Sequence, residues 1–140
     1  MRLLHTSDWH LGRTFHGHPT TDALRTVLDA LIAQVREHRV DAVLVSGDIF
    51  DHAAPAADLY RVLSDVFREI RAAGAHIVAI SGNHDSATRL GFQAEWAALA
   101  GVHVRTDPRR MREPVTLHDE HGPVHLIGLP YLEPLLVRDL

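Results

Sequence analysis

The stretch that decides the fold is residues 40–48, Val40-Asp41-Ala42-Val43-Leu44-Val45-Ser46-Gly47-Asp48. Its first six residues are almost all apolar, which is typical of a strand buried on both faces of a parallel sheet. Apolar residues recur every three or four positions over 24–35 and over 59–70, which predicts one amphipathic helix before this strand in the chain and one after it. Alternation of helix and strand predicts right-handed crossovers and therefore an α/β fold, a mainly parallel sheet flanked by helices.

Three more strands of that sheet are expected at residues 1–6, 76–80 and 102–104. Because the strands at 40–45 and 76–80 lack polar alternation, we expect helices on both faces of the sheet. Pro55 is expected at the start of the second helix and Gly74 just past its end.

The remaining segments are predicted from turn residues and shorter apolar runs. Residues 7–20 are expected to form a loop, and a shorter helix is expected over 92–99. After residue 104 the pattern changes, and residues 114–117 and 124–129 are predicted to be strands that pair around a turn at 121–123.

Composition excludes several classes of protein. The chain has 140 residues, of which 46% are hydrophobic, enough for the core of one compact domain. Cysteine is absent, so disulfides and thiolate metal sites are excluded. No apolar run reaches membrane-spanning length and the first residues do not resemble a signal peptide, so we expect a cytoplasmic protein. With 14 basic and 18 acidic residues, any contact with nucleic acid must be local, or made through metal ions or partner chains.

The residues that could carry chemistry follow three of the expected strands. Because the carboxyl ends of parallel strands meet at one edge of a sheet, where ligands of open α/β folds bind, we expect these three loops to converge. The loops are Ser7-Asp8-Trp9-His10-Leu11-Gly12, Ser46-Gly47-Asp48-Ile49-Phe50-Asp51-His52 and Ser81-Gly82-Asn83-His84-Asp85-Ser86.

Together these loops predict a site for two metal ions. Carboxylate, imidazole and amide ligands suit Mn²⁺, Fe²⁺ or Zn²⁺ better than Ca²⁺. Asp8 and His10 could bind one ion, Asp48 could bridge two ions about 3.5–4 Å apart, and Asn83 could bind the second. His84 is then expected beside the substrate. Each motif alone is also compatible with ordinary turn chemistry, and it is their coincidence at one sheet edge that favours a metal site.

These motifs resemble a known superfamily. Asp8-x-His10, Gly47-Asp48 and Gly82-Asn83-His84-Asp85 resemble the first three motifs of the calcineurin-like metallophosphoesterases. The fuller strings around them, together with Leu129-Pro130-Tyr131-Leu132, resemble the SbcD nuclease family over almost the whole chain. The resemblance implies the layered calcineurin-like fold, with residues 1–140 forming its N-terminal part.

The resemblance also implies a function. SbcD-type nucleases use two divalent ions, Mn²⁺ by expectation here, and hydrolyse DNA phosphodiesters as 3′→5′ exonucleases and single-strand endonucleases in DNA replication, recombination and repair. The implied partners are DNA, an SbcC-type ATPase and a second copy of the chain, which would form a homodimer within a heterotetramer. By position, Asp8 and His10 would bind the first metal ion, Asp48 would bridge and Asn83 would bind the second.

Two further roles follow from the resemblance. His84 would stabilise charge at the scissile group or protonate the leaving oxygen, and Asp51 would orient that histidine. Trp9 and Phe15 could stack on a DNA base or could pack beneath their loop.

One departure from the family pattern is large. The family completes its metal sites with a later Gly-His and a later Gly-His-x-His, and neither occurs in this sequence. The downstream candidates His118, His121 and His125 are expected to be solvated strand or turn residues. We therefore expect residues 1–140 to be the N-terminal portion of a longer nuclease. Two alternatives stay open: another calcineurin-like phosphoesterase (a phosphatase or a cyclic-nucleotide phosphodiesterase), or a catalytically silent chain that binds metal or a partner.

Overall fold

A four-stranded parallel sheet with the strand order β1-β4-β5-β6 forms the centre of the molecule. The computed structural model describes residues 1–135 and 137–138, so residues 136, 139 and 140 of the expected domain lie outside the described residues. The strands are β1 (Leu3–Thr6), β4 (Ala42–Ser46), β5 (His76–Ile80) and β6 (Val102–Arg105). Their register aligns His5, Leu44, Val78 and His103 across the sheet, so all four carboxyl ends lie at the same edge.

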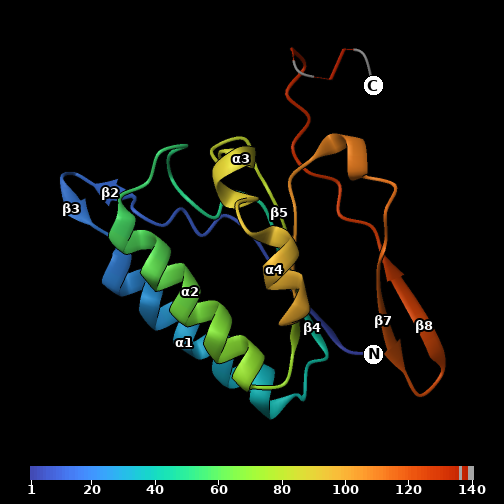
Figure 1. The fold of residues 1–140 in the computed structure, drawn as a ribbon. Coiled ribbons are helices and arrows are strands. Elements are labelled where there is room, and N and C mark those ends of the chain that lie inside the picture. The colour runs from blue at the N-terminus through green and yellow to red at the C-terminus, as the bar shows by residue number, and fades with distance from the viewer. Residues whose placement is uncertain (136, 139–140) are drawn as a thin grey trace.

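One face of the sheet is covered by helices. Figure 1 shows α1 (Thr21–Glu37) and α2 (Ala57–Ala72) as a pair of long neighbouring helices. The apolar stripes expected from the sequence become the core, because the buried residues of both helices pack with Val43, Val45, Ile77 and Ala79 of the sheet. The residues contributed by the helices are Leu28, Ile32, Val35, Leu63, Val66 and Ile70. The predicted arrangement of strand and helix is therefore confirmed on this face.

The other face carries a β hairpin. Strands β7 (Val115–Asp119) and β8 (Gly122–Leu126) pair antiparallel, and Val115 and Leu117 pack against Ala42 and Val78 of the sheet. Within residues 1–135 and 137–138, the prediction of helices on both faces is therefore wrong. An apolar strand reveals that both of its faces are buried, but not which kind of element buries them.

Most element boundaries lie within a few residues of the predictions. Strand β8 ends at Leu126, three residues before the predicted end, and two further differences concern the start of α2 and the turn before β8. Strand β5 has the predicted bounds, and Gly74 lies just past α2 with a φ of 100°. Pro55 does not start α2, because Ala56 is extended with a ψ of 150° and the helix begins at the next residue. The turn of the β7–β8 hairpin lies at residues 120–121, slightly earlier than predicted.

Several short elements were not predicted. Strands β2 (Thr14–Phe15) and β3 (His18–Pro19) form a small hairpin inside the expected loop, and its turn residues His16 and Gly17 both have a positive φ, as a tight hairpin requires. Helix α3 (Ala87–Leu90) is capped by Ser86 and was not predicted, whereas α4 (Ala94–Leu99), which follows it, confirms the helix predicted over 92–99. A single 3₁₀ turn, η1, spans Pro108–Arg110. Among the described residues, none of the helices combines the length and the apolar character needed to cross a membrane.

Candidate metal centre

The first two loops run side by side beyond the sheet. The Asp8 N–H donates to the Gly47 carbonyl at 3.1 Å, the His10 N–H to the Asp48 carbonyl at 2.9 Å, and the Leu11 N–H to the Ile49 carbonyl at 2.9 Å. These bonds continue the parallel pairing of β1 with β4 past the ends of both strands. The loop that carries Asp8 and His10 is therefore fixed against the loop that carries Asp48.

Three of the predicted ligands lie in left-handed backbone conformation. The φ angles are 57° at Asp8, 47° at His10 and 48° at Asp48. Positive φ is uncommon outside glycine, although Asp and His tolerate it better than most residues. Such strain persists only where surrounding bonds enforce it, and it is concentrated at functional sites. Here the bonds between the two loops enforce it and turn all three side chains toward one point.

Asp8, His10 and Asp48 form a group that could hold a cation. One ligand atom of each lies within 4.8 Å of the other two, and Nε2 of His10 is 3.8 Å from Oδ1 of Asp8. In the described part of the chain, Nδ1 of His10 is buried and has no well-aligned hydrogen-bond partner. Two carboxylates and the Nε2 atom of an imidazole are a donor set that fits a divalent transition metal.

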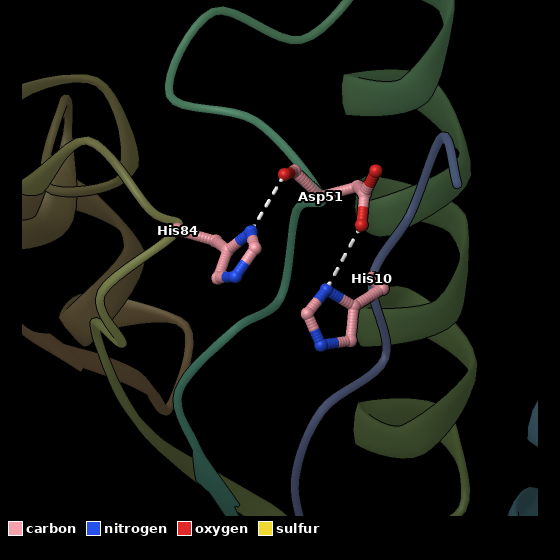
Figure 2. A group of neighbouring side chains, drawn as sticks. All are labelled: His10, Asp51 and His84. Atoms are coloured by element: carbon pink, nitrogen blue, oxygen red, sulfur yellow. Dashed lines mark hydrogen bonds and ion pairs between the residues drawn. The ribbon is translucent and has the colours of Figure 1, made fainter. Parts of the chain in front are cut away.

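Asp51 and His84 lie beside this group (Figure 2). Nδ1 of His84 is 2.9 Å from the backbone carbonyl of Asp51, whereas the Asp51 carboxylate lies 3.1 Å from Nδ1 of His10 and 3.3 Å from Nε2 of His52. The rings of His10 and His84 meet edge to face with their centroids 4.9 Å apart. Asp51 therefore contacts His84 through its main chain, and its carboxylate faces His10 instead.

The electrostatics at His84 favour the protonated ring. The hydrogen bond to the Asp51 carbonyl raises the pKa of His84, and the negative charges of Asp48 and Asp51 raise this pKa further. Partial desolvation and the positive charge of Arg13 act in the opposite direction on the same pKa. The net direction is upward, as suits a group that donates a proton.

Asn83 lies on the same loop as His84 but is less constrained. It is exposed, and its side chain makes no hydrogen bond to any residue that the structure describes. It lines a cavity of about 750 Å³ together with Gly82, Arg109 and Tyr131. Its role as a ligand of a second ion stays a prediction.

Asp85 is a residue of the site that the sequence analysis quoted without a role. Its carboxylate accepts the backbone N–H groups of Gly82, Ile49 and Phe50. The available signal was its place three residues after Gly82, where an Asp side chain can bond back to the backbone of its own turn.

Other candidate residues lie outside the cluster. Trp9 packs in the core, 5% exposed, with its indole N–H donating to Thr6 Oγ1 at 2.9 Å, whereas Phe15 is exposed on the β2–β3 hairpin. His118, His121 and His125 belong to the β7–β8 hairpin and its turn. Among the described residues, two groups could hold a cation, Asp8 with His10 and Asp48, and His10 with Asp51 and His84, and none of the three histidines is in either group. That hairpin reaches the opposite end of β1, where Asp119 contacts the Met1 amino group at 2.6 Å.

The fold and the site define a class of protein. The family model of the calcineurin-like phosphoesterases matches residues 1–133, and the chain belongs to this family. Phosphoesterases hydrolyse phosphate esters, and this family uses divalent metal ions, in agreement with the Asp8, His10 and Asp48 group. The resemblance and the fold class inferred from the sequence are thereby confirmed.

Two curated proteins are similar to this chain over almost its whole length. The chain is 30% identical over 132 residues to the SbcD subunit of the SbcCD nuclease from Staphylococcus saprophyticus, an alignment that covers 94% of this chain and 34% of the relative. It is 31% identical over 134 residues to the SbcD subunit of the SbcCD nuclease from Escherichia coli K12, with 96% of this chain and 34% of the relative covered. The chain thus spans about a third of the length of these relatives.

Proposed function

We propose that this chain is part of a metal-dependent DNA nuclease subunit of the SbcD type, which hydrolyses phosphodiesters as a 3′→5′ exonuclease and single-strand endonuclease. The observation that carries the proposal is the convergence of Asp8, His10 and Asp48 at one sheet edge, with ligand atoms within 4.8 Å of one another. The similarity to two SbcCD nuclease subunits over nearly the whole chain favours DNA as the substrate within the phosphoesterase family.

Each residue of the candidate site has a role in the proposed reaction. Asp8, His10 and Asp48 would hold the divalent ions, Mn²⁺ in our proposal, and Asn83 would contribute to the second. When bound, such ions would supply Lewis-acid chemistry, which polarises the phosphodiester and lowers the pKa of the attacking water. His84 keeps its Nδ1 against the Asp51 carbonyl, so the protonated ring can present its Nε2–H to the leaving oxygen of the DNA.

The partners in this proposal are DNA and an SbcC-type ATPase, acting in the cytoplasm in DNA replication, recombination and repair. The support for the ATPase is the name of the relatives, which are subunits of an SbcCD nuclease. The net charge of −4 gives the chain no broad attraction to DNA, so metal ions and partner chains would supply much of the affinity.

A homodimer within a heterotetramer completes the proposal. Phe92, Trp96 and Leu99 are 75%, 75% and 82% exposed on and just before α4. Phe92 also lines a mainly apolar cavity of about 480 Å³, together with residues that include Leu63 and Phe67 of α2. A cluster of large apolar side chains in water is unfavourable, and burial against a second copy would remove that cost.

Substitutions in the proposed dimer interface should lower the mass of the assembly in solution. Replacing Trp96 and Leu99 together with glutamate places charge in the interface, so we expect sedimentation velocity to report a monomer where the unmodified chain is a dimer. Phe15→Glu is the matched control, because Phe15 is 69% exposed on a different surface, and this variant should remain dimeric. An unchanged mass in the double variant would contradict the proposed interface.

The nuclease proposal predicts a substrate preference. We expect the complete gene product to release nucleotides from the 3′ ends of duplex DNA when Mn²⁺ is present and to lose this activity in a chelator. Asp65→Asn is a control, because this carboxylate pairs with Arg68 on the surface of α2 and should not affect cleavage. Hydrolysis of small phosphoesters or cyclic nucleotides without cleavage of DNA would instead identify another calcineurin-like phosphoesterase.

A further inference from the structure

The backbone beyond strand β4 poses a hydrogen-bonding problem. Pairing of β4 with β5 ends at Ser46 and Ile80, yet the chain after β4 stays inside the molecule, with Ile49 and Phe50 only 0% and 2% exposed. Buried N–H groups need partners, and leaving one unpaired destabilises the fold. The first loop does not supply these partners, because the backbone of Leu11 bonds to the Ile49 carbonyl and the Asp51 N–H instead.

The carboxylate of Asp85 accepts the backbone N–H groups that strand β5 no longer pairs with. Its Oδ1 accepts the Phe50 N–H at 2.9 Å, and its Oδ2 accepts the Ile49 N–H at 3.2 Å. The same Oδ2 accepts the Gly82 N–H at 2.9 Å, which closes the turn that presents Asn83 and His84. One side chain thus satisfies three backbone donors on two loops.

The bonding between the two loops is reciprocal. Asp85 on the third loop accepts from the second loop, and Asp48 on the second loop accepts the His84 N–H from the third at 3.0 Å. The loops also touch closely, because a Cβ added to Gly82 would collide with the backbone nitrogen and the carboxylate of Asp48. The position of the Asp48 carboxylate is therefore tied to the position of Asp85.

We propose that Asp85 is a positioning residue that fixes the left-handed Asp48 and the turn bearing Asn83 and His84 in one arrangement. The consequence for metal binding rests on the function proposed above. The hydrogen bonds themselves do not, because they link groups of the two loops directly to one another.

Amide hydrogen exchange of the metal-free chain tests the structural part of this proposal. In Asp85→Asn, one carboxylate oxygen becomes an amide donor that faces backbone N–H groups. We expect exchange at Ile49, Phe50 and Gly82 to accelerate at least about tenfold, while Val43 and Ile77 in the sheet keep their protection. The matched control is Asp107→Asn, since Asp107 also accepts one backbone N–H in a loop, from Arg109 at 2.9 Å.

Calorimetry with Mn²⁺ tests the functional part. We expect Asp85→Asn to weaken Mn²⁺ binding about 10–100-fold, the usual effect of removing a group that orients ligands, and Asp107→Asn to leave it unchanged. Asp85→Glu, which keeps the charge on a longer side chain, should recover part of both effects if Asp85→Asn folds poorly. Unchanged exchange at the three amides, uniform acceleration across the sheet, or unchanged Mn²⁺ affinity despite local acceleration would each overturn the proposal. A different result is local acceleration of amide exchange in Asp85→Asn together with no Mn²⁺ binding by the unmodified chain. That result would overturn the metal centre and the function proposed from it, but not the bridging of the loops by Asp85.

Discussion

Replacing Asp48 with alanine should lower the kcat/KM for metal-dependent DNA cleavage by at least about 1000-fold, which corresponds to about 4 kcal/mol of transition-state stabilisation. Asp48 is the predicted bridging ligand, it lies in the group with Asp8 and His10, and it is only 9% exposed. Its loss would leave the ions without a shared carboxylate. The measurement is steady-state cleavage of duplex DNA by the complete gene product.

Asp48→Ala should still fold, but with a lower free energy of unfolding. Without Asp48 Oδ1 the His84 N–H loses its acceptor, so we expect the free energy of unfolding to fall by about 1–3 kcal/mol. The matched control is Asp41→Ala, because Asp41 lies at the opposite end of the same strand and accepts the Arg2 N–H. This control should keep full nuclease activity. Cleavage by Asp48→Ala at near-normal rates would remove the basis of the metal centre.

Replacing Gly47 with alanine should lower the stability of the fold for two separate reasons. Gly47 has a φ of 83°, and a Cβ there would lie 2.8 Å from Gly82 Cα, so backbone would have to move. The left-handed conformation costs a residue with a Cβ about 1–2 kcal/mol, and overpacking against backbone adds about 1–3 kcal/mol. We expect the free energy of unfolding, measured by denaturant titration, to fall by the sum of the two.

Gly74→Ala separates these two causes. Gly74 has a φ of 100° but nothing lies within 4 Å of its added Cβ. Gly74→Ala should therefore show only the smaller loss of stability, which comes from the left-handed conformation, and should bind Mn²⁺ normally. Gly47→Ala should also lose Mn²⁺ affinity, because the second loop, which contains Gly47, must separate from the third. Equal losses of stability in the two variants would argue against close contact between Gly47 and Gly82.

Much of the sheet could be predicted because its signals are local. The apolar strand at 40–45, the stripes of the two long helices and the strand at 76–80 each follow from short-range spacing, and the structure has all of them. The same holds for the meeting of Asp8, His10 and Asp48, since the direction of parallel strands dictates which loops share an edge. The hairpin on the second face could not be predicted, because burial of that face does not specify its cover.

The sequence by itself determined the succession of the parallel strands and the two long helices, the sheet edge at which the candidate ligands gather and the residue types of those candidates, because these depend on residue spacing and strand direction. Only the tertiary structure decided which atoms meet. It turned the Asp51 carboxylate toward His10 and gave His84 a backbone carbonyl instead. It also brought Asp85 against Ile49 and Phe50, 36 and 35 residues away along the chain. Such contacts depend on how two loops pack after their strands have ended, where no periodic pattern remains to report the arrangement.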